Sequence, residues 1–112
     1  MEIQVMDLGN AAKIALLGRL DTPGVDQIET RFTASVVPAG KHAVVDLSGV
    51  TFVSSMGIRM LITTARSLSL KKAKMVLVGA QPLVKESLDH VSLSDIIPIV
   101  DGEGQALELL KS

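Results

Sequence analysis

The spacing of hydrophobic and polar positions changes several times along the 112-residue chain, and each change predicts a new element. Residues 2–6 alternate between polar and apolar, which is typical of a strand with one solvated face. A turn at 8–11 and a second strand at 12–17 predict a hairpin. Residues 18–23 then interrupt the strand pattern. We therefore expect the chain to begin with two antiparallel strands.

Helices and short apolar strands alternate over the rest of the sequence. Pro23 stands in the first turn of a predicted helix, which Asp21 or Thr22 caps. The elements expected after it are a strand at 42–47, a short turn, a helix at 54–70, a strand at 75–78, a helix opening at 81–82, a strand at 96–100 and a helix ending at 110. Pro98 places the last strand at an edge of the sheet.

Strands that alternate with helices predict right-handed crossovers and parallel pairing. The expected fold is therefore α/β, with a mixed but mostly parallel five-stranded sheet and about four helices. The predicted order is β-β-α-β-α-β-α-β-α, in one domain that spans residues 1–112.

Composition and charge narrow the classes of function. Hydrophobic residues make up 47% of the chain, and the mean hydropathy is +0.42, but no apolar run approaches the roughly 18 residues of a membrane span. The N-terminus has no signal-peptide pattern, so we expect a cytoplasmic protein without direct membrane insertion. A net charge of −1 argues against direct nucleic-acid binding. With no cysteine, and with His42 and His90 lacking ligand spacing, we expect no metal site.

Two adjacent serines, Ser54 and Ser55, open the helix that follows the apolar strand at 42–47. The first backbone N–H groups of a helix lack partners within it, and this end of the helix dipole is positive. A phosphate is well tolerated there, so both serines are candidates for a covalent switch. Ser54 also suits the N-cap, where Ser and Asp are both favoured.

Two motifs carry a resemblance that extends over essentially the whole chain. Residues 18–21 read Gly-Arg-Leu-Asp, and residues 45–58 read VDLSGVTFVSSMGI. They resemble G-x-L-D and V-D-L-S-x-V-x-F-I-D-S-S-G-L of the STAS domain of anti-sigma factor antagonists. By position, Ser55 falls where that family is phosphorylated. Ser54 replaces an aspartate, and Met56 replaces a second serine.

The resemblance implies a partner switch. The unmodified antagonist would bind an anti-sigma factor that is also a serine kinase, and would thereby free a sigma factor. Phosphorylation at Ser55, with Ser54 as second choice, would release it, and a PP2C-type phosphatase would reset it. The chain itself would need no cofactor, because the partner kinase would bind ATP and Mg²⁺.

The partner-binding surface is expected around the loop at residue 21 and the start of the serine-led helix. Its predicted residues are Asp21, Thr22, Thr51, Ser54, Ser55, Met56, Ile58, Arg59 and Met60. Met56 and Met60 lie one helical turn apart and fit equally well as core fillers or as an adaptable contact patch.

Two other functions remain open. The departures at Ser54 and Met56 favour a non-switching STAS accessory subunit of a membrane lipid transporter complex. A serine hydrolase is the remote alternative. Residues 53–57 match the G-x-S-x-G motif of hydrolases only in part, since Val53 occupies the first glycine position, and no acid–base pair accompanies the serines. We therefore expect a binding protein without catalytic residues.

Overall fold

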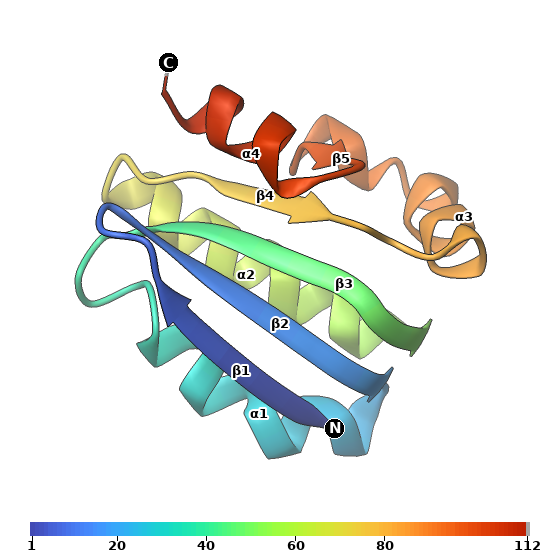
Figure 1. Ribbon diagram of the computed structural model, residues 1–112. Helices are drawn as coiled ribbons and strands as arrows, with labels where there is room; N and C mark the ends of the chain where they lie inside the picture. The colour runs from blue at the N-terminus through green and yellow to red at the C-terminus, as the bar shows by residue number, and fades with distance from the viewer. Residues whose placement is uncertain (112) are drawn as a thin grey trace.

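The computed structural model describes residues 1–111 and contains five strands, four α-helices and one short 3₁₀ helix, in the predicted β-β-α-β-α-β-α-β-α order (Figure 1). Their bounds are β1 Glu2–Asp7, β2 Ala11–Leu20, α1 Thr22–Ala34, β3 His42–Val53, α2 Ser55–Leu70, β4 Met75–Val78, α3 Pro82–His90, the 3₁₀ helix Leu93–Asp95, β5 Ile99–Val100 and α4 Glu103–Leu110.

The strands lie in the spatial order β1-β2-β3-β4-β5, so chain order and sheet order coincide. β1 is antiparallel to β2, and every other neighbouring pair is parallel. The predicted hairpin, the mostly parallel sheet and the edge position of the last strand are confirmed.

The prediction was wrong about the length of β2 and β3. β2 continues through the expected break to Leu20, and β3 continues through the expected turn to Val53. Both strands extend this far because they pair with each other up to Leu20 and Val53. The register shifts twice on the way, at bulges that absorb the extra residues. Within β3, Val50 is fully buried whereas Ser48 and Thr51 are exposed, so residues that resemble a turn form a strand with one solvated face.

The last strand is shorter than predicted. Only Ile99 and Val100 of the predicted 96–100 pair with β4, and the 3₁₀ helix at Leu93–Asp95 precedes them. Pro98 precedes the strand and contributes only its carbonyl oxygen, which accepts from the Leu77 N–H at 2.9 Å.

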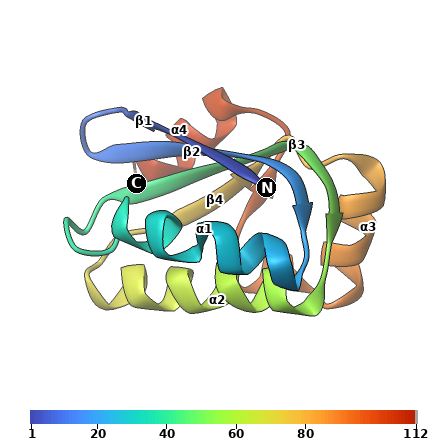
Figure 2. The ribbon, with the colours of Figure 1, turned by 90° about the horizontal axis from the view of Figure 1, so that it is seen from below.

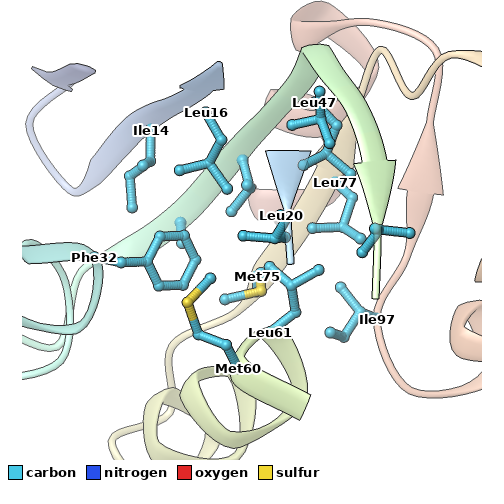
Figure 3. Packing of buried hydrophobic residues seen from close by; sticks show 14 of the residues in the cluster. Ile14, Leu16, Leu20, Phe32, Leu47, Met60, Leu61, Met75, Leu77 and Ile97 are labelled. Carbon is cyan, nitrogen blue, oxygen red and sulfur yellow. The ribbon is translucent and has the colours of Figure 1, made fainter. Parts of the chain in front are cut away.

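Helices cover both faces of the sheet, but unequally. α1 and α2 lie side by side beneath one face, and α4 lies on the opposite face (Figure 2). The larger cluster of buried side chains fills the space between the sheet and α1 and α2, and Ile14, Leu16, Phe32 and Leu61 belong to it (Figure 3). Because β2 and β3 are parallel, α1 and α2 both begin at the same end of the sheet.

Candidate functional site

Ser54 is the N-cap of α2, and its hydroxyl is used twice. The oxygen accepts from the Gly57 N–H at 3.3 Å, and the O–H donates to the carbonyl oxygen of Leu20 at 3.1 Å. The Ser54 N–H donates to the same carbonyl at 2.9 Å. The side chain is partly buried, so Ser54 joins the start of α2 to the end of β2.

Ser55 is the first residue of α2 and, unlike Ser54, it is exposed. Its hydroxyl lies at the positive end of a 16-residue helix that has no acidic side chain in its first turn. Of the two candidate serines, Ser55 is therefore the one that a modifying enzyme can reach without breaking the cap.

Gly57 allows α2 to begin close to β2. A Cβ atom at this position would lie 2.6 Å from the Leu20 carbonyl oxygen and 2.7 Å from Leu20 Cγ. Leu20 is fully buried and has little room to move. The same carbonyl that binds Ser54 therefore also sets the distance between helix and strand, and this fixes the position of Ser55.

The start of α1 is built in the same way. Asp21 is its N-cap, and Oδ1 accepts from the Gly24 N–H at 2.9 Å. A Cβ atom on Gly24 would collide with the carbonyl oxygen of Arg19. The Gly24 N–H, helped by Arg19, holds the pKa of Asp21 below its ordinary value, although partial desolvation opposes the shift. The predicted capping role of Asp21 is confirmed.

The predicted partner-binding residues do gather at this end of the sheet, but not all of them reach the surface. Thr22, Thr51 and Arg59 are exposed, and Met56 is 38% exposed. Ile58 is half-buried and packs against the core.

Met60 is a correction to the predicted surface. Its side chain is only 2% exposed and belongs to the core between α2 and the sheet (Figure 3). Four residues turn an α-helix by 400°, so Met60 is rotated by about 40° from Met56. That rotation carries Met60 to the buried side beside Leu61. Of the two interpretations of the methionines, the contact patch suits only Met56.

A pair that sequence reasoning missed lies beside these residues. Arg19 and Phe52 are cross-strand partners in β2 and β3, and the Arg19 guanidinium carbon lies 4.4 Å from the centre of the Phe52 ring. Arg19 Nε also donates to Asp21 Oδ2 at 3.3 Å. The ring remains 40% exposed. Only the register between the two strands brings this pair together.

Residues 1–111 contain no group of three or more His, Asp or Glu side chains placed to hold a metal ion. None of their helices combines the length and the apolar character that crossing a membrane requires.

Comparison with known proteins agrees with the predicted family and with the fold. The STAS domain family matches residues 2–106. BtrV of Bordetella bronchiseptica, provisionally named an anti-sigma factor antagonist, is 26% identical over 108 residues, which span 96% of this chain and 93% of BtrV.

Solved structures with the same fold include TM1081 of Thermotoga maritima, also provisionally named an anti-sigma factor antagonist. It superposes with a TM-score of 0.90 at 16% identity, over 98% of this chain and 95% of TM1081. The anti-sigma factor antagonist SpoIIAA in its unphosphorylated form gives a TM-score of 0.81 at 18% identity, over 98% of this chain and 96% of SpoIIAA. The family match extends over nearly the whole chain. The chain therefore belongs to the STAS domain family.

Proposed function

We propose that the chain is an anti-sigma factor antagonist whose binding is switched by phosphorylation at Ser55. In the unmodified state it binds an anti-sigma factor serine kinase in the cytoplasm, and the phosphorylated state is released. The observation that carries this proposal is the contrast between the two serines: Ser54 is held by Leu20 and Gly57, whereas Ser55 is exposed beside it.

The position of Ser55 suits a switch that changes binding and leaves the fold intact. A phosphate adds about −1.5 to −2 charges at neutral pH. At the N-terminus of α2 this charge stabilises the helix by about 0.3–1 kcal/mol. Against a docked protein surface the same group is desolvated without a partner, which costs several kcal/mol. Phosphorylation therefore weakens the complex with the partner and does not destabilise the fold of the domain.

The side chains around Ser55 favour the phosphorylated state of the free protein. Ser54 is neutral, whereas the aspartate of the family pattern would place a like charge next to the phosphate. Arg59 is exposed one helical turn after Ser55, a spacing at which side chains on a helix interact. We infer that the replacement of aspartate by Ser54 leaves the switch in place.

The direct test is to incubate the chain with Mg²⁺-ATP and the purified anti-sigma factor kinases of its source organism, and to locate the phosphate by mass spectrometry. We expect phosphate on Ser55, none on Ser55→Ala, and continued phosphorylation of Ser54→Thr, which retains a hydroxyl cap. A PP2C-type phosphatase is expected to remove the phosphate. Phosphate on Ser54 in the wild-type chain would contradict the proposal.

The second half of the test is binding. Ser55→Asp is expected to lose affinity for the kinase, while Ser69→Asp, at an exposed serine near the other end of α2, binds like the wild type. Equal affinity of Ser55→Asp and the wild-type chain would refute the switch. A chain that no kinase modifies, and that co-purifies with the ATPase of a transporter, would be a non-switching accessory subunit instead.

A further inference from the structure

A hollow of about 300 Å³ lies beside the end of β3, on the side away from β2. Its walls are residues 51–53 of β3 and the facing side chains of α3, with Leu83 and Glu86 among them. The hollow therefore adjoins the segment that leads directly into Ser54 and Ser55. α3 stands beside this end of β3 in Figure 2.

The hollow exists because β3 is much longer than β4. β3 has 12 residues and β4 has four, and their pairing covers only Ala43–Asp46 of β3. Beyond that point α3, rather than a strand, lies next to β3, and the hollow lies between their facing residues. Gln81, just before α3, donates to the carbonyl oxygen of Ser48 at 2.8 Å and closes the near end of the gap. Phe52 and Val53 consequently pair with β2 but not with β4, Thr51 lies at the bulge, and the three residues present a strand edge to the hollow.

Two large apolar side chains border this strand edge. Phe52 is 40% exposed and Leu83 is 75% exposed. Phe52 is already held in place on one side by Arg19, so a partner that contacts it loses little side-chain freedom. The other aromatic residue of the chain, Phe32, is fully buried in the core. An ordered, partly exposed aromatic residue next to an open strand edge is typical of a contact that contributes strongly to binding.

The charge on the α3 side of the hollow is acidic. Glu86 lines it with a side chain that is 67% exposed, and His90 Nε2 lies 3.9 Å from Glu86 Oε1. A basic side chain on an incoming segment would therefore find a carboxylate next to the apolar contact.

We propose that this hollow receives an extended segment of the partner kinase, which pairs with the edge of β3. Strand addition uses the side of a strand that has no neighbouring strand, and β4 does not reach that side of residues 51–53. An apolar side chain of the segment lies between Phe52 and Leu83, and a neighbouring basic side chain faces Glu86. The inference rests on the proposed function and extends the binding surface from α2 to α3.

The test compares affinities for the purified kinase that phosphorylates the chain, loaded with ADP so that no phosphate is transferred. We expect Leu83→Asp to bind at least tenfold more weakly than the wild type. Leu70→Asp is the matched control, because Leu70 is 88% exposed at the far end of α2, and it should bind within twofold of the wild type. Glu86→Lys should also weaken binding, whereas Glu108→Lys, 75% exposed on α4, should not.

Hydrogen exchange of the complex identifies the kind of contact. Strand addition slows amide exchange at residues 51–53 when the kinase binds. Unchanged exchange there, or wild-type affinity of Leu83→Asp while Ser55→Asp loses affinity, would overturn the inference and leave the switch standing. If the unphosphorylated wild-type chain does not bind the kinase, the proposed function itself fails, and the inference fails with it.

Discussion

Replacing Gly57 by alanine tests how closely α2 approaches the end of β2. In an unconstrained helix the substitution stabilises by up to about 1 kcal/mol, because alanine has the higher helix propensity. Here the added Cβ would lie 2.6 Å from the Leu20 carbonyl oxygen and 2.7 Å from Leu20 Cγ. Overpacking of this kind typically costs about 1–3 kcal/mol. Since Leu20 is fully buried and its carbonyl binds Ser54, we expect a net loss of about 1–2 kcal/mol.

Gly104→Ala in α4 is the matched control, because a Cβ at that position meets nothing within 4 Å. We expect it to stabilise the protein by about 0.3–1 kcal/mol. Urea unfolding followed by far-UV circular dichroism measures both variants, and an unchanged m-value shows that the unfolded states are comparable. Gly57→Ala should also slow the proposed phosphorylation at Ser55, because the start of α2 must shift. A Gly57→Ala protein as stable as the Gly104→Ala protein would refute the close approach.

Three further predictions concern the caps and the core. Ser54→Ala removes both hydrogen bonds of the Ser54 hydroxyl and should lower the free energy of unfolding by about 1–2 kcal/mol. Ser54→Thr keeps a hydroxyl and should nearly restore the wild-type value. Equal melting temperatures of Ser54→Ala and wild type would contradict this prediction. In urea unfolding, Met60→Ala should lower the free energy of unfolding by about 2–5 kcal/mol and Met56→Ala by less than about 0.5 kcal/mol, because only Met60 is buried. Similar losses for the two variants would contradict the placement of Met60 in the core and Met56 at the surface. The pKa of Asp21 is lowered in the folded state, so its contribution to stability is present above the unfolded pKa near 3.9 and disappears as the pH falls through the folded pKa. Acid titrations should therefore show that wild type loses more stability than Asp21→Ala over this range, and parallel curves would exclude the effect.

Local chemistry explains why the helix starts were predictable. Asp21 before Pro23, and Ser54 before the apolar helix pattern, are capping signals that act within a few residues. Such signals need no knowledge of the rest of the fold, and both caps lie where the sequence places them. The order of elements follows from the same local patterns.

Features that depend on strand pairing were not predictable. β2 and β3 extend to Leu20 and Val53 because each supplies the other with main-chain partners, and bulges adjust the register between them. Their ends contain Gly18, Gly49 and Thr51, which in isolation favour turns. The exposure of Phe52 and the hollow next to α3 depend on β4 ending early, a fact about a strand more than 20 residues away.

The presence of Ser54 where the family pattern has an aspartate bears on what the proposed partner kinase would recognise. An ionised aspartate accepts hydrogen bonds but donates none, so it could cap α2 but not bind the Leu20 carbonyl oxygen through its side chain. Ser54 does both. The substitution therefore keeps the helix start and adds a bond to β2, at the loss of a negative charge beside Ser55. A kinase that selects its substrate by that charge should phosphorylate Ser54→Asp faster than wild type. A kinase that recognises the geometry of the helix start should phosphorylate Ser54→Asp more slowly than wild type, because the side-chain hydrogen bond to the Leu20 carbonyl oxygen is lost. The sign of this rate change separates recognition by charge from recognition by geometry.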